Sequence, residues 1–550
     1  MDREQHKFPT RSYPYRYRSA PGEEGAEADA TADAIRSIVM EAGRLYRFVL
    51  GVDQIPTAMT AIDPDLPHDP FAELLLHRGI FPLTLRTLLA ELDKLNGQAG
   101  GLPEQNCFLV GDGGQIPWKP ETAEVNRLLR FVVTRARNNE VELMVSAHTA
   151  LDSDDQFLQL ISWDPTKGAF NFYERRGGTW LWAGNSHHSL APDSRGQGPF
   201  DSHVNGSMVM KELRAPWSNW HSMRASIQDN VLAPDDLLRN EPLFQGRTSA
   251  HVLETSVVRP GIERWTQARL KRAMQNNSLI DVRYFMRQVL EATTVNLISS
   301  DMQSREVTDA GTLTLPTSFF LNTEALLDII GLEPDISVVK APGRFYLEAL
   351  QRYEFEIRDE TFRQPGDTFF AFLVPEPAFE DLSVLSILVR EKLISSRFAA
   401  SLLMVDFPNP LFSKRRRQLG VYVPLTAVLN PANEIKSDIE DSFVAALEAA
   451  EPGLAAESAG KEFLSNWRLP LDQWRKSFEK RIEDYFARLQ EISGTAEGID
   501  SWMRLAESRR REFRRRPLAE FRLTTPTTNI DENAPTLLMR ADGTVEPVSN

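Results

Sequence analysis

The sequence predicts an α+β fold in which helical N- and C-terminal regions surround a central antiparallel β meander. Apolar residues recur at helical spacing before residue 140, alternate with other residues at 140–184, and return to helical spacing after about residue 259. The chain has 550 residues, which is more than one hydrophobic core usually organises. We therefore expect two or three subdomains.

Composition restricts the classes of protein to which the chain can belong. Hydrophobic residues at 42% and aromatic residues at 9% are typical of a globular protein, whereas a formal charge of -15 argues against general nucleic-acid binding. The single cysteine, Cys107, excludes an internal disulfide and a cysteine-rich zinc site. No apolar stretch reaches the roughly 18 residues of a membrane helix, and the N-terminus lacks a signal-peptide core. We expect a cytoplasmic protein without a transmembrane segment. The sequence is also compatible with a homo-oligomer.

The first part of the chain is expected to hold a flexible arm followed by helices. Residues 1–33 are rich in Pro, Gly, Glu and Ala and contain few large apolar side chains that would order them. Residues 34–139 are expected to be mainly helical, because apolar side chains recur there at a period near 3.6. The expected helices cover about 34–50, 71–95 and 121–137.

Residues 140–225 are expected to form an aromatic-rich antiparallel β region with a histidine loop. Four segments of strand character, VELMVSA, FLQLISW, AFNFYE and TWLWAG, include two pairs joined by DPTKG and RRGG turns. Because side chains alternate along a strand, Trp180 and Trp182 share one face. Residues 185–206 have no regular period and form a long loop, a type of segment that is often functional.

The remaining residues are expected to alternate between helical and mixed regions. Residues 226–300 carry two helical patterns, and residues 301–430 mix strands, turns and a helix-like run from Leu382. Residues 431–516 are expected to be helical, and the polar, Pro- and Thr-rich residues 517–550 are expected to form a flexible tail.

The segment from Trp163 to His221 is where we expect the functional site, because it holds five of the ten tryptophans and four of the nine histidines. Tryptophan supplies flat apolar area, and histidine binds metals or moves protons near neutral pH. Mononuclear iron or zinc sites usually combine two or three imidazoles with a carboxylate. The candidate metal ligands are His203, His187 and His221, and the candidate catalytic groups are Asp201 and Glu212.

Spacing makes His203 the leading candidate among these residues. In an extended chain Asp201 and His203 point to one side and can reach a common atom. The alternative is that His203 hydrogen-bonds the loop backbone while Asp201 caps a turn. His187 and His188 diverge in a strand, so at most one of them is expected to function. Glu212 shares a strand face with two methionines, and burial there would raise its pKa. The alternative is that Glu212 lies at a solvated edge or forms an ion pair with Arg214.

Aromatic and basic residues nearby are candidates for holding a cofactor. Trp217, Trp220 and His221 lie on one face of an expected helical turn, where they line either a pocket or an ordinary core. Trp182 is a candidate from the meander. Arg195 begins the sequence RGQG, which offers a guanidinium and backbone donors to an anion but is also typical of a simple turn.

Two basic runs lie outside this segment, at Lys414–Arg417 and at Arg509–Arg516. Such runs bind RNA, anionic lipid or an acidic partner when they are exposed. The acidic residues around them favour the other interpretation, in which they form intramolecular pairs or a solvated helix face.

The leading hypothesis is a metal- or haem-dependent oxidoreductase, oxygenase-like, that acts on an apolar or aromatic small molecule. Iron fits the imidazole and carboxylate candidates, and a noncovalent haem needs only one histidine and an apolar cage. The alternative is a non-catalytic binding or assembly protein that uses an aromatic surface and the basic C-terminal helices. A metal-free hydrolase is less favoured, because no nucleophile stands in a recognisable turn.

Overall fold

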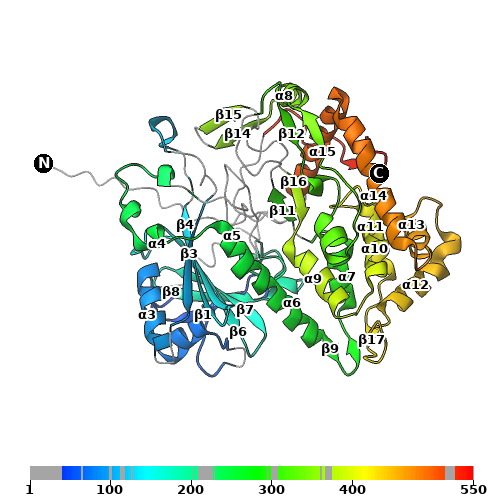
Figure 1. The fold of residues 1–550 in the computed structure, drawn as a ribbon. Coiled ribbons are helices and arrows are strands. Elements are labelled where there is room, and N and C mark those ends of the chain that lie inside the picture. The colour runs from blue at the N-terminus through cyan, green and yellow to red at the C-terminus, as the bar shows by residue number, and fades with distance from the viewer. Residues whose placement is uncertain are drawn as a thin grey trace.

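A computed structural model describes most of the chain. The described residues are 40–63, 66–97, 102–111, 118–124, 127, 129–201, 203–208, 227, 229–293, 295–298, 307–359, 362–365, 374–514 and 527–548. The fold is α+β, with a β-sheet half built from the N-terminal part and a mainly helical half built from the C-terminal part (Figure 1). The expected fold class is therefore confirmed.

An eight-stranded sheet in the order β2-β1-β8-β7-β6-β5-β4-β3 is the framework of the first half. Strands β3 to β8 pair with their chain neighbours as an antiparallel meander, whereas β1 joins β8 in parallel. Gly168 and Gly177 have φ values of 59° and 55°, which glycine adopts readily in the tight turns of the meander. The strands are β1 (Leu45–Arg47), β2 (Thr57–Ala58), β3 (Glu104–Val110), β4 (Arg130–Arg137), β5 (Glu140–His148), β6 (Leu158–Asp164), β7 (Ala169–Arg176) and β8 (Thr179–Asn185).

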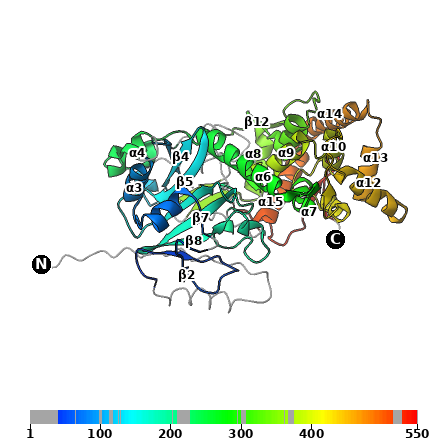
Figure 2. The same cartoon turned by 90° about the horizontal axis from the view of Figure 1, so that it is seen from below.

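Both faces of this sheet are covered, and Figure 2 shows the sheet between α3 (Leu85–Gly97) and α6 (Arg259–Ala273). We call one face the Trp180 face, which carries Trp180 and Tyr173. The ring of Phe71, in α2 (Pro70–Ala72), lies 4.7 Å from Trp180 and 5.0 Å from Tyr173. We call the other the Trp163 face, where the guanidinium of Arg264 in α6 lies 4.2 Å from the Trp163 ring centre.

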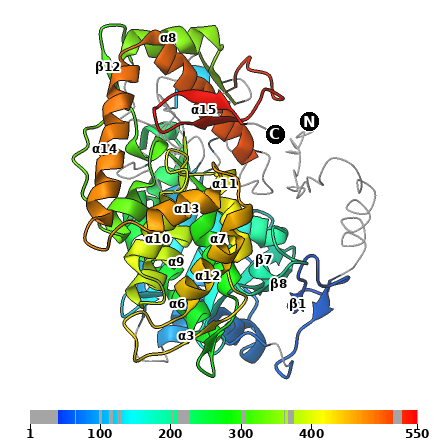
Figure 3. The same cartoon turned by 90° about the vertical axis from the view of Figure 1, so that its right-hand side faces the viewer.

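The second half consists of helices with short two-stranded pairings between them, and Figure 3 shows α14 and α15 side by side. Its helices are α7 (Val282–Leu290), α8 (Gly343–Arg352), α9 (Phe379–Arg390), α10 (Ser396–Leu403), α11 (Lys414–Gln418), α12 (Ile439–Ala450), α13 (Ala459–Trp467), α14 (Trp474–Ser493) and α15 (Ala496–Arg514). Its paired strands are β9 (Met274–Gln275), β10 (Ser278–Leu279) and β17 (Ala427–Val428), β11 (Val295–Ile298) with β16 (Val374–Pro377), β12 (Thr312–Thr314) with β13 (Lys340–Pro342), β14 (Glu356–Asp359) with β15 (Phe362–Pro365), and β18 (Leu537–Met539) with β19 (Val545–Pro547).

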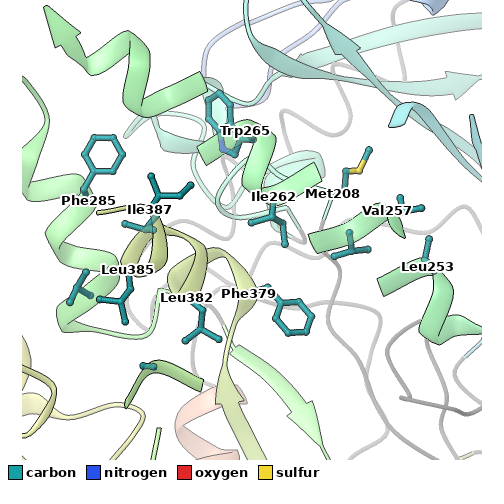
Figure 4. Packing of buried hydrophobic residues seen from close by; sticks show 14 of the residues in the cluster. Met208, Leu253, Val257, Ile262, Trp265, Phe285, Phe379, Leu382, Leu385 and Ile387 are labelled. Carbon is teal, nitrogen blue, oxygen red and sulfur yellow. The ribbon is translucent and has the colours of Figure 1, made fainter. Parts of the chain in front are cut away.

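The two halves share one hydrophobic core through the packing of α6 against α9 (Figure 4). Ile262 and Trp265 of α6 are each at most 2% exposed, and Leu385 and Ile387 of α9 are at most 3% exposed. Burial of such side chains stabilises by roughly 2 kcal/mol each. The sheet half is thus held to the helical half by apolar contacts.

Several elements confirm the sequence expectations. The meander expected at 140–184 is present as β5 to β8, and helices occur within 71–95 as α2 and α3 with the π-helix η1 (Glu73–His77) between them. The run from Leu382 falls within α9 and α10. In these segments the apolar residues recur at a clear period and the segments end at turn-forming residues, so the local sequence pattern is sufficient to predict the element.

Other expectations were wrong, and those at β1 and β4 failed because apolar runs buried on both sides imitate a helical period. The described part of the helix expected at 34–50 contains strand β1, and the helix expected at 121–137 is replaced by β4. A helix expected through residue 298 ends at Leu290, and β11 follows. Within the expected tail, β18 and β19 form a hairpin whose Met539 is 1% exposed.

Within the described residues, no helix combines the length and the apolar character that crossing a bilayer requires.

Candidate functional site

The structure describes only some of the predicted site residues. Glu212, Trp217, Trp220 and His221 lie outside the described residues, and so does the side chain of Asp201, whose backbone ends a short 3₁₀ turn. Their predicted roles stay predictions. The described candidates are His203, His187, Trp182 and Arg195, and they do not gather at one place.

His203 packs against the Trp163 face of the sheet, with its ring 5.2 Å from that of Phe172. Its Nδ1 lies 2.7 Å from the carbonyl oxygen of Ser207, so Nδ1 carries the proton and donates it to that oxygen. Burial lowers the pKa of His203 to about 4; the hydrogen bond to Ser207 opposes this shift, and the nearby charge of Arg130 contributes to it. The ring is therefore neutral at pH 7, and its Nε2 has no hydrogen-bond partner among the described residues.

A small cavity opens beside His203 on the sheet, which we call the His203 cavity. Its volume is 40 Å³, enough for a water molecule or two, or for the polar head group of a larger ligand. Neighbouring strands supply its polar wall, since Ser146 pairs with Gln159 and Gln159 pairs with Glu174 in the sheet register. The polar residues that line it are Arg130, Ser146, Gln159, Glu174 and His203.

Ser146 and Arg130 give this cavity its chemical character. The Ser146 Oγ is buried and has no hydrogen-bond partner among the described residues. A buried hydroxyl in that state costs about 1–3 kcal/mol, which a fold normally avoids. Arg130 is 8% exposed and keeps its guanidinium beside His203. A positive charge, a hydroxyl donor and a neutral imidazole acceptor thus meet at one void, and the acid in its lining, Glu174, is paired with Arg176 at 2.9 Å.

His187 lies elsewhere and is held by partners. Its Nε2 is 3.1 Å from Nη1 of Arg272, which donates to it, and its ring also hydrogen-bonds the backbone of Lys167. Burial lowers the pKa of His187 to about 4, with the Arg272 charge as the next cause. For His187 to bind a metal ion, Arg272 or Lys167 would have to move.

Trp182 and Arg195 are also separated from the His203 cavity. Trp182 lies on the Trp180 face, is 1% exposed, and donates from Nε1 to Oδ1 of Asn171 at 2.9 Å. The sheet therefore stands between Trp182 and His203. Arg195 does not line the cavity; burial lowers its pKa, and the neighbouring charge of Arg287 is the next cause.

Sequence reasoning missed Arg130 and Ser146. Arg130 was assigned to a helix that is in fact β4, and Ser146 was read as part of an apolar strand. The sequence signal for such a residue is a polar side chain that stands among apolar side chains in a strand buried on both faces. That signal needs the register of the sheet, because Ser146 and His203 come together only in space.

Three arginines of the basic runs have structural roles. Arg416 donates to the carbonyl oxygens of Leu290 and Pro410, at 3.2 and 2.9 Å. Arg511 donates to that of Asp531 at 2.7 Å, and Arg509 donates to a backbone oxygen as well. The expected intramolecular pairing is confirmed for these three buried arginines, and they are not part of a partner surface.

A second, larger cavity of 380 Å³ lies at the end of β6. Its charged groups are already matched, because Arg264 pairs with Glu140 at 3.0 Å and Glu142 pairs with Arg137 at 3.2 Å. Its histidines, His68 and His77, are exposed to solvent. The larger cavity therefore lacks the buried, unmatched polar atoms that distinguish the His203 cavity.

Metal ligands and relatives give no further assignment. Within the described residues, no group of three or more His, Cys, Asp and Glu side chains is placed to hold a metal ion, and that set does not include Glu212 or His221. No protein-family model, curated protein or solved structure matches the chain. Function has to be inferred from the residues of the His203 cavity themselves.

Proposed function

We propose that the protein binds a small molecule with an oxyanion head group of the carboxylate class, held in the His203 cavity. The observation that carries the proposal is that the Ser146 Oγ and the His203 Nε2 have no partner among the described residues and line one cavity with the buried Arg130. Folded proteins leave few buried polar atoms unsatisfied, and those that remain are often filled by a ligand or water.

The three groups divide the work of recognition by their chemistry. Arg130 supplies a positive charge beside the cavity, which attracts an anion. Ser146 donates its hydroxyl proton to an oxygen of the same head group. His203 accepts a hydrogen bond at Nε2 from a hydroxyl or a protonated oxygen of the ligand. A bound anion would raise the pKa of His203, so the ligand itself makes His203 a better proton acceptor.

Calorimetric titration at pH 7 with benzoate, lactate and inorganic phosphate tests this proposal. We expect binding of at least one carboxylate, weakened about tenfold in Ser146→Ala and in His203→Gln, because each removes one hydrogen bond worth about 1.4 kcal/mol. His187→Gln is the matched control, since it changes a partly buried histidine that does not line the cavity. Equal affinities in all three variants, or no binding of any probe, would refute the proposal.

A metal- or haem-dependent oxidoreductase that acts on an apolar or aromatic molecule is the second candidate. It is favoured by the anchoring of His203, since histidines that bind metals usually donate their other ring N–H to a carbonyl or carboxylate. Elemental analysis and an absorbance spectrum of protein purified without chelators test it. About one equivalent of iron or a haem Soret band that is lost in His203→Ala supports this candidate, and a colourless metal-free protein removes it.

For both candidate functions, carboxylate binding and oxidoreductase activity, we propose a cytoplasmic location. Cys107 is a free, buried thiol, and burial raises its pKa to about 12. Such a thiol is compatible with a reducing compartment.

A further inference from the structure

The turn at residues 203–207 fixes the ring of His203. The Gly206 N–H donates to the carbonyl oxygen of His203 at 2.8 Å, and the His203 Nδ1 donates to that of Ser207. Gly206 has a φ of 75°, and a Cβ there would lie 2.6 Å from the Ser186 carbonyl oxygen, so only glycine fits. The turn thus sets both the place of the ring and the nitrogen that carries its proton.

Three side chains hold this turn from outside. Ser186 donates to the carbonyl oxygen of Gly206 at 2.6 Å, and the Trp265 Nε1 donates to that of Asn205 at 2.7 Å. The third contact reaches the helical half, because the Asn205 Nδ2 donates to the Thr293 Oγ1 at 2.9 Å. Thr293 follows α7, and all these groups are buried or nearly so.

Thr293 connects the turn to a buried acid of α9. The Thr293 hydroxyl donates to Oδ1 of Asp381 at 2.5 Å, and the Thr293 N–H donates to Oδ2 at 2.9 Å. Gln288 of α7 also donates to Asp381, at 3.1 Å, and accepts from Arg269 of α6 at 2.6 Å. The carboxylate therefore ties together the ends of α7 and α9, next to the α6–α9 packing in Figure 4.

We infer that Asp381 and Thr293 are positioning residues for His203, so that the packing of α7 against α9 sets the orientation of the imidazole in the sheet half. The Thr293 hydroxyl is the link in this chain, because it donates to Asp381 and so presents its lone pair to Asn205. Residues that orient a functional group in this way change its performance when they are altered, although they touch no ligand. The ligand readout of this inference rests on the proposed function, whereas its spectroscopic readout does not.

The test compares Thr293→Val with Thr293→Ser in the full chain. Valine keeps the shape of the side chain and removes the hydroxyl, whereas serine keeps the hydroxyl and both hydrogen bonds. We expect Thr293→Val to weaken binding of the carboxylate probe about tenfold, with Thr293→Ser within about twofold of the parent protein. Thermal denaturation checks that both variants are folded at the temperature of the titration.

The second readout is the ring nitrogen signals of His203 in protein labelled with ¹⁵N-histidine, assigned through their loss in His203→Gln. We expect the parent protein and Thr293→Ser to show the neutral tautomer with the proton on Nδ1, and Thr293→Val to show altered ring shifts. Identical shifts in the valine and serine variants would overturn the positioning role, whatever ligand binds. Altered shifts in a protein that binds no carboxylate would leave the positioning role standing and refute the proposed function.

Discussion

The two faces of the large sheet are both buried, yet the carboxylate of Asp69 on one face and the hydroxyl of Ser146 on the other differ in how fully they are hydrogen-bonded. On the Trp180 face, the Asp69 carboxylate accepts from the backbone N–H groups of Phe71 and Ala72 at 2.9 and 3.1 Å. It also accepts from the Tyr173 hydroxyl at 2.5 Å and from the Asn171 amide at 2.8 Å. Every oxygen of this acid is used to dock α2 on the sheet.

On the Trp163 face, the Ser146 hydroxyl and the Nε2 of His203 have no such partners among the described residues. Both faces belong to the same strands, so the difference does not come from the kind of secondary structure. The difference between Asp69 and Ser146 indicates that burial of a polar group is not by itself a sign of a functional site. Buried polar atoms without a partner among the described residues also occur elsewhere, for example Nε of Arg175 on the Trp180 face. The His203 cavity is distinguished because its unused hydroxyl lines a void beside Arg130 and His203.

Removal of the saturated acid should have the largest effect on stability. We expect Asp69→Ala to lower the free energy of unfolding by about 4 kcal/mol, because α2 loses its N-cap and Tyr173 and Asn171 keep unpaired buried groups. Urea denaturation measures the change. Asp152→Ala, which removes an exposed partner of Arg86, should change stability by less than about 1 kcal/mol. Similar losses in the two variants would mean that the hydrogen bonds of Asp69 contribute no more to stability than an exposed ion pair.

The pH dependence of stability tests the other face. Burial lowers the pKa of His203 to about 4 from an ordinary value of 6.5, so the folded state binds the proton less readily than the unfolded chain. The contribution of His203 to the free energy of unfolding is therefore fully present above pH 6.5. This contribution is lost as the pH falls toward 4, and the loss is about 3 kcal/mol at most. Denaturation curves of the parent protein between pH 7 and 4 should fall more steeply than those of His203→Gln. Parallel curves would mean that folding does not shift the pKa of His203.

Two serines on neighbouring strands, one on each face of the sheet, allow the most direct comparison, with the smallest expected changes in stability. Ser162 of β6 is fully buried on the Trp180 face and hydrogen-bonds Asp69, whereas Ser146 of β5 faces the His203 cavity. We expect Ser162→Ala to cost about 1–2 kcal/mol, and Ser146→Ala to be neutral or slightly stabilising, because it removes an unsatisfied hydroxyl. Thermal unfolding measures both. A larger loss in Ser146→Ala would show that its hydroxyl supports the fold.

The sequence was informative where a local pattern was unambiguous. The alternation in TWLWAG correctly predicts that Trp180 and Trp182 share a face. The loop composition singles out His203, which lines a cavity and whose functional role stays a prediction. Strand β4 was missed because its apolar run is buried on both faces and imitates a helix. The grouping of Ser146 with His203 depends on strand register and on a loop that folds back, and neither leaves a local trace.

The parallel pairing of β1 with β8 has a consequence for the order of folding. Thr179 hydrogen-bonds the backbone of Arg44 across a sequence separation of 135 residues, whereas the strands of the meander are joined by short connections. Contacts between distant residues form late, because closing a long loop costs entropy before any contact repays it. During synthesis we therefore expect β1 to stay unpaired until the meander has formed. Until then β8 has an unpaired edge, and such an edge can associate with a strand of another copy of the chain.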